Sequence, residues 1–69
     1  MESEVIFLVQ ESADGGYEAR ALDYSIYTQA ETLESLKREV IDAVKCHFDS
    51  LNLPRMIRLH LVKDEVLAL

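Results

Sequence analysis

Residues 13–36 read ADGGYEARALDYSIYTQAETLESL, and this stretch decides the fold. Its Asp-Gly-Gly segment supplies residues that tolerate a positive φ, which tight hairpin turns require. Residues 17–22 then alternate apolar and polar side chains, the pattern of a strand with one buried face. A bend at 23–25, a shorter strand at about 26–30 and a helix start at Thr32 follow. The stretch therefore predicts a small α+β domain.

Two further strands flank this stretch. Residues 4–11 form the first, and its centre, VIFLV at 5–9, is apolar at every position. A continuous apolar run predicts a strand that is central in the sheet and buried on both faces. Residues 56–62 form the last strand, with apolar residues at alternate positions. The expected order is β-β-β-α-β, a four-stranded sheet with one helix packed on one face, and residues 1–69 form a single domain.

The helix is expected to run from residue 33 to about residue 50. Thr32 can cap its N-terminus through the side-chain hydroxyl, and Glu34 places negative charge near the positive end of the helix dipole. Asn52 is the expected C-terminal cap, and Pro54 prevents the helix from continuing. The residues expected to pack on the sheet step by three or four, with two neighbours that widen the stripe: Leu33, Leu36, Val40, Val44, Phe48 and Leu51, with Ile41 and Ala43.

The length and composition limit the size of the core. A chain of 69 residues, 49% of them hydrophobic, is long enough for one domain but buries only a modest apolar interior. Cys46 is the only cysteine, so no intrachain disulfide can form, and no Cys/His set has the spacing of a zinc site. Small domains without such links are often stabilised by a partner subunit. The lone cysteine, the missing basic leader and the short apolar runs predict a cytoplasmic protein that does not enter membranes.

The net charge of −6 is distributed unevenly. Residues 1–34 hold eight acidic residues and only Arg20 as a base, whereas residues 35–69 hold five acids and six bases. An acidic chain is repelled by phosphate backbones, so we expect no autonomous nucleic-acid binding. The acidic half is suited to a basic partner, although ordinary solubility charge explains the same excess.

Three local patterns together carry a resemblance to a known family. The first is the apolar strand followed by an acid/glycine turn and an aromatic residue, at 11–17; the second is the short strand that leads to Leu22-Asp23. The third is the strand-to-helix junction TQAETLESL at 28–36. With these patterns, roughly residues 4–50 resemble the HicB-like antitoxin family. This resemblance implies a partial RNase H-like fold in which the fourth strand lies beside the first.

The resemblance also implies a role. Proteins of this kind form dimers or larger assemblies, and many neutralise a small basic RNase toxin. Many carry a C-terminal DNA-binding segment, but only seven residues follow Val62, so the repressor half of the role is not expected here. The Pro-Gly that often follows the bend aspartate is replaced by Tyr24-Ser25-Ile26, which changes the expected shape of the bend. We expect a non-catalytic antitoxin-like interaction domain without cofactor or metal.

Two alternatives remain open: a metal-dependent nuclease or hydrolase of RNase H-like type, and an oligomeric module that binds a small ligand. Asp23 is the best single carboxylate for a metal-dependent nuclease, although an aspartate at a bend more often bonds the local backbone. Cys46 and His47 are helix neighbours that point about 100° apart, so they form no nucleophile–base pair. We expect Cys46 to be a core or boundary thiol and His47 a surface imidazole.

Some side chains are candidates for an interface between subunits. One helix covers one face of the sheet, so Ile6 and Leu8 are expected on an uncovered apolar face, which typically marks an interface. The tail at 64–69 ends apolar and could extend the last strand or bind a neighbour. We expect a dimer or a tetramer in which subunits pack these faces or join sheet edges. The candidate interface residues combine the uncovered face, tyrosines and the last strand: Ile6, Leu8, Tyr17, Tyr24, Tyr27, His60 and Val62.

Overall fold

The predicted hairpin turn joins the first two strands, β1 (Glu4–Glu11) and β2 (Tyr17–Ala21), in the computed structural model, which describes residues 4–69. Gly15 adopts a φ of +100°, as the turn requires. The backbone N–H of Ser12 donates to the carbonyl of Gly16 at 2.7 Å, and that of Gly15 donates to the carbonyl of Ser12 at 3.1 Å. The glycine pair therefore serves the turn, as the sequence predicts.

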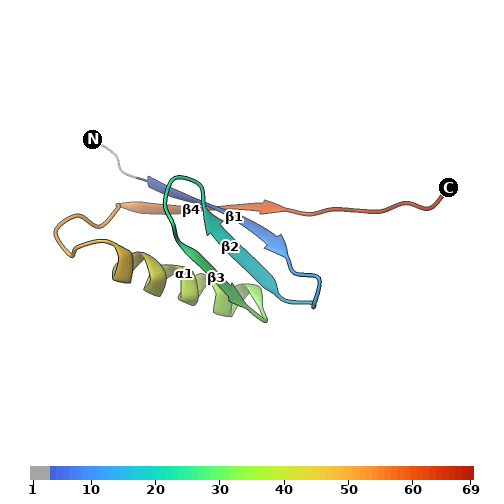
Figure 1. Cartoon of the computed structure of the whole chain (residues 1–69), viewed down its shortest axis with the longest axis horizontal. Helices are drawn as coiled ribbons and strands as arrows, with labels where there is room; N and C mark the ends of the chain where they lie inside the picture. The colour runs from blue at the N-terminus through green and yellow to red at the C-terminus, as the bar shows by residue number, and fades with distance from the viewer. Residues whose placement is uncertain (1–3) are drawn as a thin grey trace.

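The sheet has the strand order β3-β2-β1-β4, with β3 at Tyr27–Ala30 and β4 at Met56–Val62. β1 pairs antiparallel with β2 and parallel with β4, so the predicted central strand does lie in the middle (Figure 1). The parallel pairing needs a crossover, which the helix α1 (Leu33–His47) provides between β3 and β4. The predicted α+β class, the element order and the placement of the fourth strand beside the first are confirmed.

Alternation along β1 divides its apolar run between the two faces of the sheet. Val5, Phe7 and Val9 face the helix and are at most 2% exposed. Ile6 and Leu8 lie on the other face, where they are only half-buried. The prediction that one helix leaves these two side chains on an open face is confirmed. Full burial of both faces is not observed, because no second layer covers the open face in the described residues 4–69.

The helix packs on the sheet through the predicted stripe, which is shorter than expected. Leu36, Val40 and Val44 are buried in one cluster with Ala19 and Ala21 of β2, whose small side chains allow the helix to approach closely. Further members of the stripe are partly buried: Leu33, Ala43 and Phe48. Leu51 is 93% exposed and Ile41 44% exposed, so the sequence prediction was wrong for both.

The helix ends three residues earlier than predicted. Phe48 is the C-cap, with an extended backbone at φ −107° and ψ 148°, so Asn52 does not cap the helix. Phe48 turns toward the β2–β3 connection, where its ring meets that of Tyr24 edge to face at a centroid distance of 5.0 Å. This tertiary contact, which sequence periodicity does not reveal, offers a physical reason for the early end.

The N-terminus of the helix is capped as predicted, with Ser35 completing a reciprocal pair. The Thr32 hydroxyl accepts from the backbone N–H of Ser35 at 3.1 Å, and the Ser35 hydroxyl accepts from the backbone N–H of Thr32 at 3.3 Å. Each bond satisfies a backbone donor that the helix itself leaves without a partner.

Replacing Thr32 with alanine is expected to lower the free energy of unfolding by about 1 kcal/mol, because a first-turn N–H loses its acceptor. Urea denaturation followed by circular dichroism measures the change. Thr32→Ser, which keeps the hydroxyl, is the control and should stay within about 0.5 kcal/mol of the parent. Equal losses in both variants would contradict the capping role.

Strand boundaries near the bend differ by one residue from the predictions. β2 ends at Ala21 rather than Leu22, although the backbone N–H of Leu22 still donates to the carbonyl of Ile6 at 2.9 Å. β3 begins at Tyr27, while Ile26 turns into the core and is 6% exposed. The tight return of the chain around 22–25 shortens both strands.

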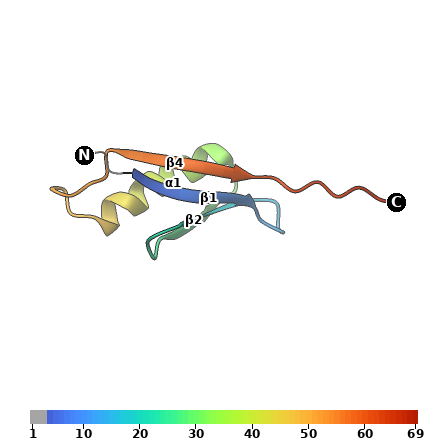
Figure 2. The ribbon, with the colours of Figure 1, turned by 90° about the horizontal axis from the view of Figure 1, so that it is seen from above.

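β4 receives less cover from the helix than β2 and β3 do, because α1 lies against those two strands. Ile57 and Leu59 face the helix side and are half-buried, whereas Leu61 is 55% exposed. Beyond β4 the chain runs on as an extended tail at 63–69 that projects away from the body of the domain (Figure 2). Among the described residues, no helix has the length and apolar character needed to cross a membrane.

Candidate functional site

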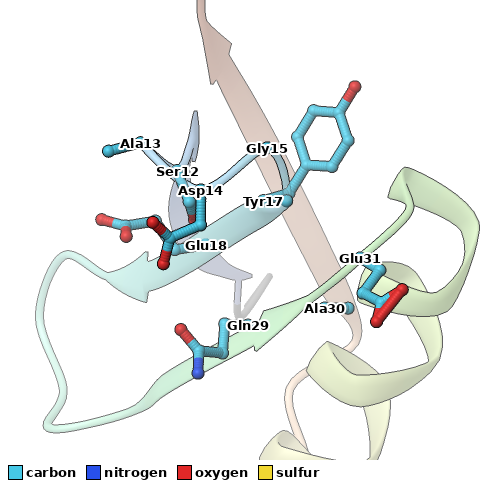
Figure 3. A pocket seen from close by; sticks show the side chains of 10 residues that line it. Ser12, Ala13, Asp14, Gly15, Tyr17, Glu18, Gln29, Ala30 and Glu31 are labelled. Atoms are coloured by element: carbon cyan, nitrogen blue, oxygen red, sulfur yellow. The ribbon is translucent and has the colours of Figure 1, made fainter.

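A broad depression of about 900 Å³ lies at the hairpin end of the sheet (Figure 3). It is bounded by the β1–β2 turn, the start of β2 and the end of β3. We call it the hairpin depression, and ten residues line it: Ser12, Ala13, Asp14, Gly15, Gly16, Tyr17, Glu18, Gln29, Ala30 and Glu31.

Strand register brings the walls of the hairpin depression together. Tyr17 pairs with Ala30 and Glu18 pairs with Gln29 across β2 and β3. The turn approaches the end of β3 closely, because a Cβ built on Gly16 would lie 2.7 Å from the carbonyl oxygen of Ala30. A residue without a side chain is therefore required at position 16.

The lining is acidic. Three of its ten residues carry carboxylates, Asp14, Glu18 and Glu31, and none carries a positive charge. Figure 3 shows the carboxylates of Asp14 and Glu18 on one side, with the Gln29 amide below them and Glu31 across the depression near the start of the helix. Carboxylates accept hydrogen bonds without donating any, so this arrangement suits a cationic group that supplies donors.

A phenol on the open face of the sheet orients part of this lining. The Tyr27 hydroxyl lies 3.3 Å from Oε1 of Gln29 and 3.5 Å from Oε2 of Glu18. One hydroxyl proton serves two acceptors, which leaves most of the acceptor capacity of Glu18 for a ligand. Tyr27 therefore links two residues of the hairpin depression, Glu18 and Gln29, to the open face of the sheet.

Comparisons with known proteins identify the family. A UPF0150 protein of Thermotoga maritima is 43% identical over 67 residues, which cover 97% of this chain and 94% of the relative. A UPF0150 protein of Archaeoglobus fulgidus is 58% identical over 52 residues, covering 75% of this chain and 77% of the relative. The chain belongs to the UPF0150 family. No family model and no solved structure matches it.

The open face of this UPF0150 domain holds five of the seven predicted interface residues. Register places Tyr27, Arg20, Leu8 and His60 in one row across the four strands. Ile6 and Val62 lie on the same face, and both are half-buried. Glu4 of β1 also bridges to Arg58 of β4 there, with a 2.5 Å contact between Oε2 and Nε. The face mixes apolar and charged side chains.

The other two predicted interface residues lie elsewhere. Tyr17 is on the helix side of the sheet and packs against the core. Tyr24, in the β2–β3 connection, meets the rings of His47 and Phe48 at centroid distances of 5.8 and 5.0 Å. The UPF0150 fold thus separates the three tyrosines, which the sequence had grouped, into three surroundings.

The residues considered for catalysis or metal binding also form no common site within the described residues. Asp23 is exposed in the β2–β3 connection, and His47 is exposed as predicted. Cys46 is exposed as well, so the prediction of a core or boundary thiol was wrong; it follows the buried Val44 by two residues, which sets it off the packed stripe of the helix. In the region described, residues 4–69, no group of three or more His, Cys, Asp or Glu side chains is placed to hold a metal ion.

Sequence reasoning did not single out the hairpin depression of the UPF0150 domain. The sequence at 12–16 indicates only a hairpin turn, and the acidic residues around it indicate only a general negative charge. The only signal was the excess of acids within residues 1–34. The pairing of Glu18 with Gln29, which builds one wall, depends on the register of β2 and β3.

Proposed function

We propose that this UPF0150 domain is a non-catalytic interaction domain that acts as a HicB-type antitoxin and neutralises a small basic RNase toxin by direct binding. The observation that supports the proposal is the hairpin depression, a concave surface with three carboxylates and no base among its ten lining residues. The sequence resemblance over residues 4–50 supports the same role.

The hairpin depression can receive an arginine or lysine side chain of the toxin. Asp14 and Glu18 supply carboxylate acceptors from one side, and the Gln29 amide oxygen adds a neutral acceptor beside them. Charge-assisted hydrogen bonds of this type are stronger than neutral ones and favour the planar guanidinium of arginine. Basic side chains of the toxin that bind in the hairpin depression can no longer bind RNA. The inhibition is therefore steric and electrostatic.

The acidic half of the chain extends the attraction beyond direct contact. Eight acids against one base in residues 1–34 draw a basic partner toward this end of the domain and raise the association rate. The affinity is expected to fall as salt is added, because exposed charges are screened. A basic RNase and its antitoxin act in the cytoplasm, where the single free thiol of Cys46 is also stable.

The test first asks whether a short basic protein is encoded beside the gene for this chain, and then uses that protein; the absence of such a gene would count against the proposal. Purified UPF0150 domain should suppress its RNA cleavage at a stoichiometric ratio, and calorimetry should show a complex. The double variant Asp14→Lys/Glu18→Lys is expected to weaken binding by about tenfold or more, equivalent to about 1.4 kcal/mol. Suppression of cleavage should be lost in parallel.

The matched control is Glu39→Lys/Asp42→Lys, which changes the net charge equally at two exposed helix positions. This control should bind within about threefold of the parent after allowance for long-range charge. Equal weakening by both doubles would show that only net charge matters. Failure of the parent to suppress cleavage by the neighbouring protein would overturn the proposal.

A further inference from the structure

Two features at one edge of the sheet have no role in the proposed binding site. β4 is the terminal strand in the order β3-β2-β1-β4, so its outer backbone edge has no strand partner within residues 4–69. The tail at 63–69 then continues in line with β4 as exposed, extended chain (Figures 1 and 2). A free edge with an extended arm is a template for pairing with another chain.

The tail is apolar where it is most exposed. Val66 is 94% exposed, Leu67 82% and Leu69 fully exposed. The tail does not turn back onto its own β4, and no other part of the described chain, residues 4–69, covers these three side chains. Another molecule that pairs with the edge of β4 would cover them.

We propose that this cover is a second copy of the chain: β4 and the tail form one long strand that pairs antiparallel with its copy across a two-fold axis. The two sheets then join edge to edge into one of eight strands. The axis is perpendicular to the sheet, so each residue meets a residue on the same face, and odd-numbered positions pair with odd-numbered positions.

One register matches the side chains best, with Asp64 of the two copies at the axis. Leu61 then lies opposite the partner's Leu67, and Leu59 opposite the partner's Leu69, all on the helix side of the sheet. Lys63 faces the partner's Glu65, which forms two opposite-charge pairs per dimer. The unfavourable feature of this register is the repulsion between the two Asp64 carboxylates, which meet at the two-fold axis and are exposed to solvent. Registers shifted by two residues place Glu65 opposite either Leu61 or its own copy.

A partial groove beside β4 fits this arrangement. It has a volume of about 150 Å³ on the helix side of the sheet, and its lining includes Tyr17, Leu33 and the half-exposed Leu61. In the proposed register the partner's Leu67 packs beside Leu61 at the rim of this groove. The helix leaves this part of β4 uncovered, because it lies over β2 and β3.

The first experiment measures the oligomeric state of the whole chain by size-exclusion chromatography with light scattering at micromolar concentration. The parent should be a dimer, and Leu67→Asp should raise the dimer dissociation constant by about tenfold or more. Leu51→Asp is the matched control, because Leu51 is 93% exposed in a loop outside the proposed contact. A monomeric parent, or a dimer that survives Leu67→Asp, would overturn the proposal.

The second experiment tests the register. Lys63→Glu places like charges opposite each other and should weaken the dimer, whereas Lys63→Glu combined with Glu65→Lys should restore it. In a Cys46→Ser background, Asp64→Cys should cross-link two copies under mild oxidation much faster than Glu65→Cys, because only position 64 meets itself. Equal cross-linking, or no rescue by the double variant, would overturn the pairing. Neither readout uses a toxin, so failure here leaves the antitoxin proposal standing.

Discussion

Replacing Phe7 with alanine is expected to lower the free energy of unfolding by about 3–5 kcal/mol. Phe7 is fully buried in the middle of β1, between the helix and the neighbouring strands. Its ring is the largest fully buried side chain among the described residues, so its loss leaves a cavity that the small core cannot collapse to fill. A 69-residue domain lies at the lower end of the usual stability range of about 5–15 kcal/mol. Much of the variant should therefore be unfolded at 37 °C.

Urea denaturation followed by circular dichroism measures this effect, at one fixed protein concentration because any dimer adds to the apparent stability. The matched control is Tyr27→Ala, which removes an aromatic ring that is 53% exposed on the open face. The control should lose about 1 kcal/mol or less. A loss below about 1 kcal/mol for Phe7→Ala would contradict the position of the core.

Gly16→Ala is expected to lower the free energy of unfolding by about 1–3 kcal/mol, through overpacking rather than loss of contacts. The new Cβ would lie 2.7 Å from the carbonyl oxygen of Ala30, which is a backbone atom. The turn or the end of β3 must move, because no flexible side chain can yield. Such a shift also deforms the hairpin depression, so toxin binding should weaken together with stability.

The control for this prediction is Ala13→Ser in the same turn, where the side chain is exposed. It should change the free energy of unfolding by no more than about 0.5 kcal/mol. Thermal and urea unfolding of both variants provide the comparison. If Gly16→Ala were as stable as the control, the close approach of the turn to β3 would be wrong.

Local chemistry explains why so much of the fold is predictable. The glycine turn, the Thr32 cap and the alternation at 56–62 are encoded by residues that are neighbours in sequence, so they reveal elements and their bounds. β1 and β4 have the predicted limits, and the helix begins where its cap indicates. The end of the helix was predicted three residues too late. At this point Phe48 contacts Tyr24, a residue distant in sequence, and local periodicity does not reveal such a contact.

The candidate site was less predictable for the same reason. Ile6 and Leu8 were placed on the open face correctly, since strand alternation and a single helix imply it. The hairpin depression requires the pairing of Glu18 with Gln29 and the approach of the turn to Ala30. Cys46 was misplaced, although the period of 3.6 residues already sets it off the stripe, since it follows the buried Val44 by only two residues.

By itself, the sequence determined the α+β class, the order of the elements, the turn, the cap and the acidic first half of this UPF0150 chain. These features depend on propensity and on periods of two and 3.6 residues, which are local properties. The tertiary structure alone decided that α1 covers β2 and β3, that β4 keeps a free edge, and that three acids gather at one end. Those facts follow from register and crossover geometry, which bring together residues far apart in the chain.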